Sequence, residues 1–209
     1  MPARERCRLY LVATPAGDVA AFRDDLLAAL DGGDVASVEL AMIHASDESV
    51  AAACRALAPV VRRRDVAFLV RDHPEIAADQ GLDGVYLKRR RAEVDAARRL
   101  LGKDGIVGVY AASSRHRAME AGEAGASFVA FGPLFGPEGH GTRIVSWWDA
   151  LMVVPSVARG GMDLETVPRA VRAGADFVAV GRAVWRHPQG PGTAVRLFND
   201  AVDRARASC

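Results

Sequence analysis

The chain has 209 residues, of which 50% are hydrophobic and 25% are charged, and its formal net charge is +1. This composition is typical of one globular domain, and a charge so close to zero predicts no general attraction to nucleic acid or membranes. No apolar stretch has the length of a secretion signal or a membrane span, and the three cysteines make no disulfide or metal-binding pattern. We therefore expect a cytoplasmic protein with neither nucleic acid nor membrane as a partner.

Short apolar or β-branched runs alternate along the chain with longer runs of helical period. The predicted strands span residues 8–12, 35–42, 65–70, 84–87, 106–109, 128–131, 153–158 and 177–180. The predicted helices span residues 18–30, 48–63, 74–80, 91–101, 114–124, 146–151, 163–173 and 183–206. Strict alternation of eight strands and eight helices favours parallel strands joined by right-handed crossovers. The expected fold is therefore α/β, a single (β/α)8 TIM barrel over residues 1–209 rather than an open sheet.

One phrase occurs twice in the second half of the chain, as GASFVAFG at residues 125–132 and as GADFVAVG at residues 174–181. Each copy joins the end of a helix to a strand and ends on a glycine that opens a connection. In a parallel barrel the connections that follow the strands carry the functional site. The connection after the sixth predicted strand, residues 132–146, is the longest and is rich in glycine and proline, which is typical of a functional segment.

Glycines also follow the seventh and eighth predicted strands, at Gly160, Gly161 and Gly181. These two connections form the recurrent phosphate site of barrels, because glycine lets backbone N–H groups approach a ligand and a helix N-terminus adds partial positive charge. We expect the three glycines and Arg182 to bind the phosphate of a small-molecule phosphate ester. The alternative is that the glycines only form tight turns and that Asp163 caps the following helix.

Five segments resemble the thiamine-phosphate synthase and thiazole tautomerase superfamily. They are RLYLVATP (8–15), GLDGVYL (81–87), AMEAGEAGASFVAFGPLFGP (118–137), SVARGGM (156–162) and AGADFVAVGRAVW (173–185). The resemblance implies a transferase of thiamine biosynthesis that couples hydroxymethylpyrimidine diphosphate with thiazole phosphate and releases pyrophosphate. Magnesium assists that reaction by neutralising charge on the leaving group. The thiazole phosphate would occupy the glycine connections.

The sequence departs from the family pattern in the half of the site that the resemblance assigns to the pyrimidine diphosphate. Where the family has Gln-Leu-Arg-Glu-Lys after the second strand, this chain has ELAMI at residues 39–43, so Glu39 replaces the glutamine. Where the family has Asn-Asp after the third strand, this chain has Arg71 and Asp72. The aspartate that follows the fourth strand in the family is Arg91 here. One metal ligand, Asp72, remains, and Mg²⁺ binding is in question because a cation replaces the second carboxylate.

The resemblance also assigns roles to the remaining polar residues of this half-site. Thr142 and Arg143 are the nearest match to a Thr-Lys pair that contacts diphosphate in the family. The implied diphosphate-binding residues are Arg71, Arg91 and Thr142. The implied catalytic residues are Glu39, Asp72 and Arg143.

Each of these features has a structural alternative as well. Glu39 alternates with the inward-facing positions of its strand, and its alternative role is an ion pair with Arg71. Asp72 alternatively caps the third helix. The run KRRR at residues 88–91 either replaces part of the metal's charge or forms a solvated surface. The tryptophan pair at residues 147–148 fills a gap between helices or an interface of a homo-oligomer.

Three functions are weighed on these residues. The first is a thiamine-phosphate synthase-like enzyme with weak or altered activity, because its diphosphate and magnesium half-site is degenerate. The second is a non-catalytic paralogue that binds a thiazole or thiamine phosphate ester. The third is a phosphosugar isomerase or epimerase, for which the sequence lacks paired acid and base carboxylates. We expect the first, and turnover with both substrates and magnesium distinguishes it from the second.

Overall fold

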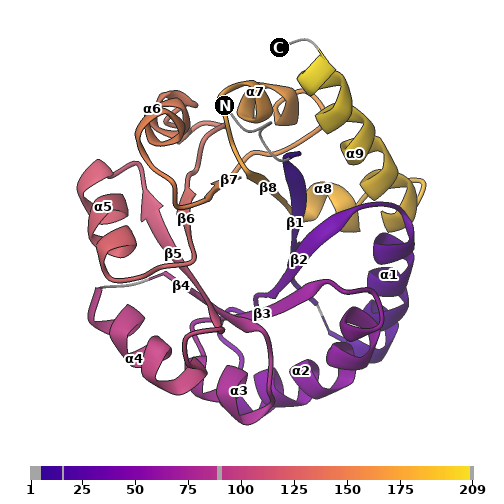
Figure 1. Ribbon diagram of the computed structural model, residues 1–209. Helices are drawn as coiled ribbons and strands as arrows, with labels where there is room; N and C mark the ends of the chain where they lie inside the picture. The colour runs from indigo at the N-terminus through magenta and orange to yellow at the C-terminus, as the bar shows by residue number, and fades with distance from the viewer. Residues whose placement is uncertain (1–5, 16, 89–90, 208–209) are drawn as a thin grey trace.

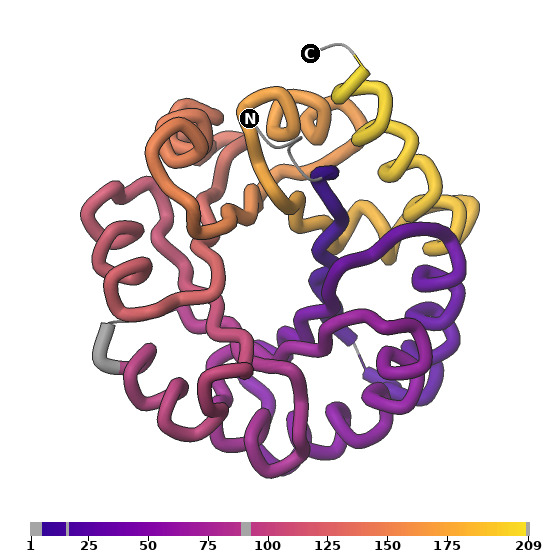
Figure 2. The backbone as a smooth tube through the Cα atoms, viewed as in Figure 1, coloured from indigo at the N-terminus to yellow at the C-terminus, as the bar shows by residue number. Residues whose placement is uncertain are grey.

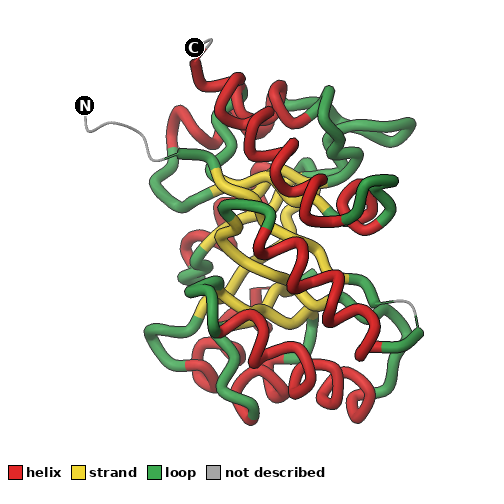
Figure 3. Tube along the Cα trace, turned by 90° about the vertical axis from the view of Figure 1, so that its right-hand side faces the viewer, coloured by secondary structure: helices red, strands yellow, loops and turns green. Residues whose placement is uncertain are grey.

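The protein is a closed barrel of eight parallel strands. The computed structural model describes residues 6–15, 17–88 and 91–207, with the side chains of residues 91 and 92 outside that description. Each strand pairs with the next in sequence order, and β8 pairs with β1 to close the barrel. The helices form an outer ring around the strands (Figures 1 and 2). The side view shows the strands at the centre of the molecule, with helices outside them (Figure 3). The predicted (β/α)8 barrel is confirmed.

The elements alternate in the predicted order. The strands are β1 (Arg8–Ala13), β2 (Val35–Leu40), β3 (Ala67–Arg71), β4 (Gly84–Leu87), β5 (Ile106–Ala112), β6 (Phe128–Phe131), β7 (Ser156–Arg159) and β8 (Phe177–Val180). The helices are α1 (Val19–Asp31), α2 (Asp47–Arg62), α3 (Pro74–Asp79), α4 (Arg91–Leu101), α5 (Arg115–Glu123), α6 (Arg143–Leu151), α7 (Val167–Arg172), α8 (Arg182–Trp185) and α9 (Pro191–Ala207).

Most elements begin or end within four residues of the predicted bounds, and two of the differences have a clear local reason. The predicted helix 183–206 is two helices, α8 and α9, because Pro188 and Gly190 lie between them and Gly190 adopts a left-handed φ of 84°. Strand β5 continues three residues beyond its predicted end. Its pairing with β6 shifts register between Tyr110 and Ala112, and Ala112 has a φ of 53°. Such an irregularity changes the direction of the strand, here at the carboxyl end of β5, where the connection to α5 begins.

The strands separate two apolar layers because their side chains alternate between the two faces of the sheet. The larger layer lies between the strands and the helices and includes Leu9, Leu11 and Trp148. The smaller layer fills the barrel and consists of Tyr10, Leu69, Tyr86, Phe128, Ala130, Val157 and Ala179. The interior is therefore a packed core, and any ligand site has to lie at a mouth of the barrel rather than inside it.

The tryptophan pair on α6 has one buried member. Trp148 is 1% exposed, contacts Phe131 edge-on, and donates its indole N–H to Val154 O at 2.7 Å. Trp147 is half-buried, and the Arg115 guanidinium lies over its ring. Trp148 therefore packs between α6 and strand β6, whereas the prediction placed the pair in a gap between helices or at an interface.

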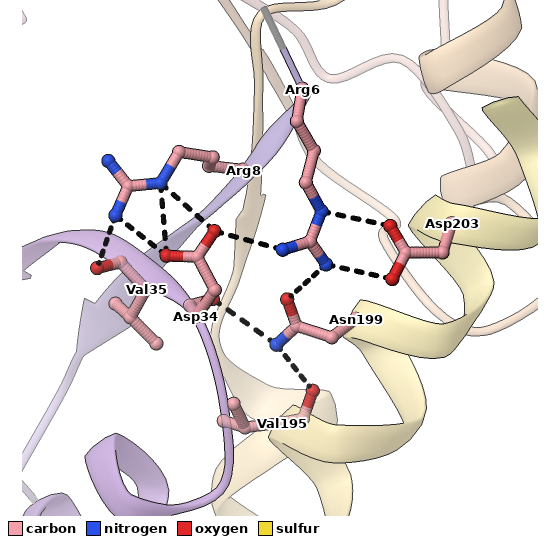
Figure 4. Close-up of polar contacts among 7 residues, drawn as sticks. All are labelled: Arg6, Arg8, Asp34, Val35, Val195, Asn199 and Asp203. Atoms are coloured by element: carbon pink, nitrogen blue, oxygen red, sulfur yellow. Dashed lines mark hydrogen bonds and ion pairs between the residues drawn. The ribbon is translucent and has the colours of Figure 1, made fainter.

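Polar contacts fasten the start of β1 to the end of the chain (Figure 4). The Arg6 guanidinium donates to Asp34 before β2 and to Asn199 and Asp203 on α9. Asn199 in turn donates to the Asp34 carbonyl at 3.2 Å. Since α9 also packs beside α1, these contacts close the helical ring on the face opposite the functional loops. None of the helices within the described ranges is long and apolar enough to cross a membrane.

Candidate functional site

The connections after β7 and β8 meet at one cavity of about 580 Å³ at the carboxyl end of the barrel. All four residues that were predicted to bind phosphate line it: Gly160, Gly161, Gly181 and Arg182. The structure thus brings together two segments that are twenty residues apart in sequence. Phosphate binding itself stays a prediction, which depends on the shape and the charge of this cavity.

The glycine pair after β7 is required by its backbone and by its neighbours. Gly160 and Gly161 have φ angles of 86° and 69°, a region that disfavours residues with a Cβ atom. A Cβ on Gly161 would lie 2.5 Å from Phe135 O, because the connection after β6 packs directly onto this turn. Hydrogen bonds hold the two segments together: Leu134 N donates to Arg159 O, and Phe135 N donates to Gly160 O. The first copy of the repeated phrase therefore leads into the segment that supports the glycine turn.

The turn that follows the glycines is organised by Asp163. Its carboxylate accepts hydrogen bonds from the backbone N–H groups of Glu165 and Thr166, at 3.0 and 2.8 Å. Slight burial opposes ionisation, but the Thr166 and Glu165 hydrogen bonds outweigh it and lower the pKa of Asp163. The helix α7 begins later than predicted, and its N-cap is Thr166 rather than Asp163. Asp163 instead accepts hydrogen bonds in the turn that precedes the helix. Asp163 therefore fixes the shape of the glycine connection.

The cavity has the charge of an anion site. Three arginines line it, Arg159, Arg182 and Arg186, against the single carboxylate of Asp163. Three guanidinium groups and one carboxylate give this lining a formal charge of +2, and the carboxylate makes its backbone hydrogen bonds within its own turn, to Glu165 N and Thr166 N. Guanidinium groups match phosphate oxygens in geometry as well as charge. The cavity therefore suits a phosphate ester better than a neutral or cationic ligand.

A buried ion cluster lies at the centre of the barrel mouth. The Glu39 side chain on β2 is fully buried, and the Arg71 and Arg159 side chains are 10% and 14% exposed. Arg71 at the end of β3 donates from Nε to Glu39 Oε1 at 2.6 Å, with a second contact from Nη2. Arg159 at the end of β7 donates from Nη1 to Glu39 Oε2 at 3.2 Å. The predicted Glu39–Arg71 pair is thus part of a three-residue cluster.

The floor of this cluster is aromatic. The guanidinium carbon of Arg159 lies 4.5 Å from the ring centroid of Tyr86, and that of Arg71 lies 5.8 Å from it. Burial opposes the charge of Arg159, but the Glu39 carboxylate outweighs it and raises the pKa of Arg159, which stays a permanent cation. Burial, followed by the charge of Glu39, raises the pKa of Tyr10 well above its usual range.

The predicted magnesium half-site is not assembled as a metal centre. Asp72 is exposed, has a φ of 58°, and accepts a hydrogen bond at Oδ1 from Lys88 N at 2.7 Å, so it joins two connections rather than capping α3. The N-cap of α3 is His73, without a side-chain bond. Arg91 starts α4, but its side chain lies outside the described part of the chain. Within that part, no three His, Cys, Asp or Glu side chains come together. The residues present do not fit a two-carboxylate magnesium site.

The remaining predicted residues lie apart from the cavity. Thr142 is the N-cap of α6 and makes no side-chain cap bond, and the Arg143 side chain is exposed at the first position of that helix. Neither residue lines the cavity of the glycine connections. Their predicted contacts with diphosphate therefore stay predictions, and they require the connection after β6 to approach a ligand that is bound at the mouth.

A second cavity of about 880 Å³ adjoins the first and was not predicted. It lies over the connections after β1 and β2, and both cavities share Arg182 and Arg186. Its walls include Phe22 and Trp185, whose rings pack 4.8 Å apart. Ile43, which stands where the family has a lysine, is 61% exposed at its edge. The two cavities together offer space for a phosphate at one end and a larger group at the other.

Sequence reasoning missed Arg159 and Arg186. Arg159 was detectable, because it alternates with Val157 on β7 and therefore points into the barrel directly before the glycine pair. No sequence signal places Arg186, which follows α8 and reaches both cavities only through the fold.

Comparison with known proteins places this chain in a family. A family model described as thiamine monophosphate synthase matches residues 9–184. A thiamine-phosphate synthase from Rhodospirillum centenum is 50% identical over 200 residues, covering 92% of this chain and 96% of that protein. One from Hyphomonas neptunium is 42% identical over 211 residues, covering 94% of each. The structure of thiamine phosphate pyrophosphorylase from Pyrococcus furiosus shares the fold, with 22% identity, a TM-score of 0.82, and coverage of 95% and 96%. The chain belongs to the thiamine monophosphate synthase family.

Proposed function

We propose that the protein is a thiamine-phosphate synthase with an altered diphosphate half-site. In this reaction the bond between the pyrimidine methylene carbon and the diphosphate oxygen breaks, and its electron pair leaves with pyrophosphate. The thiazole nitrogen uses its lone pair to form the new carbon–nitrogen bond. No protein nucleophile is needed, so the protein has to orient two substrates and stabilise charge.

The observation that carries the proposal is the arginine-lined cavity over the β7 and β8 connections, in a chain that matches a thiamine-phosphate synthase along 92% of its length. Gly160, Gly161 and Gly181 would let backbone groups approach the thiazole phosphate, while Arg182 would supply its counter-charge. Arg182 also borders the second cavity, so a phosphate held here would present the rest of the substrate toward that space.

Asp72 is the single carboxylate of the implied magnesium site that this chain keeps, and one carboxylate does not make the two-carboxylate site, so the mechanism is not routed through the ion. When bound beside a diphosphate, the ion would neutralise leaving-group charge, and Asp72 is the residue that would hold it. The changed half-site motivates the second candidate function, a non-catalytic paralogue that binds a thiazole or thiamine phosphate ester. Both candidates use the same phosphate cavity, so turnover separates them.

The test is a turnover assay on the purified full-length chain with both substrates, with and without Mg²⁺, in which thiamine phosphate is quantified chromatographically. We expect slow but measurable product formation. Arg182→Met should raise the Michaelis constant for thiazole phosphate about tenfold or more, since one charge-assisted contact is worth about 1.5–3 kcal/mol. Arg196→Met is the matched control. Arg196 is exposed on α9 and lines neither cavity, so this substitution removes the same charge away from the site. Phosphate-ester binding without turnover would favour the paralogue.

A further inference from the structure

The ion cluster at the barrel mouth carries more positive than negative charge. It contains one carboxylate, Glu39, and two guanidinium groups, Arg71 and Arg159, so its formal charge is +1. All three side chains are nearly or fully buried. A buried one-to-one pair satisfies itself, whereas an additional buried cation has a large desolvation cost unless another anion joins it. The cluster is therefore one negative charge short.

The Arg159 guanidinium has N–H donors that are not used within the cluster and could bind such an anion. A guanidinium group carries five N–H donors, and within the described residues its only acceptor is Glu39. Tyr86 covers one face of the group, and Arg159 is also one of the residues that line the cavity of the glycine connections. A guanidinium group that is fixed by a carboxylate and an aromatic ring, and that keeps unused donors, has the arrangement of a preorganised anion receptor.

The position of this guanidinium matters as much as its charge. Arg159 belongs to β7, but it contacts Glu39 on β2 and Tyr86 on β4, across the barrel mouth. The Arg159 guanidinium therefore lies beside β2 and β4, at the part of the barrel mouth where this chain lacks polar residues of the family pattern. Arg71 from β3 brings the second cation to the same place.

We propose that Arg159, held in place by Glu39, binds the diphosphate of the second substrate and supplies there the positive charge that a two-carboxylate magnesium site would otherwise supply. This inference rests on the proposed function. Glu39 is a positioning residue in it: the carboxylate does not touch the substrate but fixes the two guanidinium groups. The chain would then bind pyrophosphate without a divalent cation.

The test is calorimetric titration of the purified full-length protein with inorganic pyrophosphate in the presence of EDTA. We expect wild-type protein to bind, Arg159→Met to lower the affinity about tenfold or more, and Arg196→Met to leave it unchanged. Binding by wild type only when Mg²⁺ is added would overturn the proposal, as would an Arg159→Met affinity equal to that of wild type.

A second variant separates positioning from charge. Glu39→Gln makes the cluster more positive, so an effect of charge alone predicts tighter pyrophosphate binding, whereas loss of alignment predicts weaker binding. We expect weaker binding, and tighter binding would show that Glu39 is not a positioning residue. If this variant does not fold, the double variant Glu39→Gln with Arg71→Gln keeps the formal charge at +1 while removing the alignment. It too should bind pyrophosphate more weakly.

Turnover keeps this inference distinct from the proposed function. If pyrophosphate binds through Arg159 but no thiamine phosphate forms, the proposed function fails and the anion site stands. If wild type turns over and Arg159→Met binds pyrophosphate normally, the anion site fails and the function stands.

Discussion

The glycine turn after β7 offers a sharp test of the phosphate cavity, through the substitution Gly161→Ala. Gly161 combines two constraints, a φ of 69° and close packing against Phe135. Gly102, at the end of α4, has nearly the same φ, 73°, but nothing lies within 4 Å of the place where its Cβ would be. Gly102→Ala is therefore a matched control that carries the backbone strain without the collision.

The expected magnitudes follow from these two differences. A Cβ atom in the left-handed region costs about 1–2 kcal/mol, so both variants should lose that much free energy of unfolding. In Gly161→Ala the new methyl would also lie 2.5 Å from Phe135 O, whereas ordinary contact begins at 3.4 Å. Forcing an extra methyl into a packed site costs a further amount of about 1–3 kcal/mol. We expect Gly161→Ala to be the less stable variant by that difference.

Urea unfolding measures the stability, and calorimetric titration with inorganic phosphate measures the site. The displaced segment around Phe135 should distort the glycine turn and lower phosphate affinity about tenfold, equivalent to about 1.4 kcal/mol, while Gly102→Ala binds as wild type does. Two equally destabilised variants that bind phosphate equally well would refute the reasoning, because the turn would then tolerate a methyl group and contribute no binding geometry.

Three further outcomes are expected. Glu39→Gln should lower the free energy of unfolding by about 3 kcal/mol in urea titrations, because it leaves two buried guanidinium groups without their carboxylate; a loss below about 1 kcal/mol would contradict the buried cluster. The folded-state pKa of Asp163 is lowered, so its stabilisation is complete above its unfolded pKa of about 3.9 and is lost as the pH falls through the folded value. The stability difference between wild type and Asp163→Asn should therefore stay constant above about pH 5 and shrink as the pH falls below about 4, and a difference that does not change at low pH would contradict this. Arg6→Ala should cost about 1 kcal/mol, as measured by urea unfolding, since it removes contacts that join β1 to α9; unchanged stability would show that they contribute nothing.

The barrel itself was predictable because its signal is local and repeated. Apolar strand runs and helical runs each have their own period, and eight of each in alternation leave few topologies. The errors lie where local signals compete. Helix-forming residues 183–206 hid the break at Pro188, and the end of β5 was missed because a register shift at Tyr110 leaves no mark in the residue pattern.

Half of the candidate site was also predictable. Gly160, Gly161 and Gly181 were found because a glycine after an apolar strand indicates a tight turn or a close backbone approach at its own position, whatever surrounds it. Asp72 shows the limit of this reasoning. Its carboxylate suggested a metal ligand or a helix cap. It does not cap α3 but accepts a hydrogen bond from Lys88 N, sixteen residues away, and its role as a metal ligand stays a prediction. Nothing near Asp72 in the sequence identifies that partner.

The fold, the family resemblance and the glycine connections could be predicted from the residue pattern, since each depends on residues close together in the chain. How the charges combine depends on residues far apart in the chain, which only the folded barrel brings together. Arg159 reaches from β7 to Glu39 on β2, a pairing across 120 residues that exists because the closed barrel points both side chains at one axis. The departures at Glu39 and Arg71 appear in the sequence as losses from a half-site, and in the structure they form one buried cluster with a third residue.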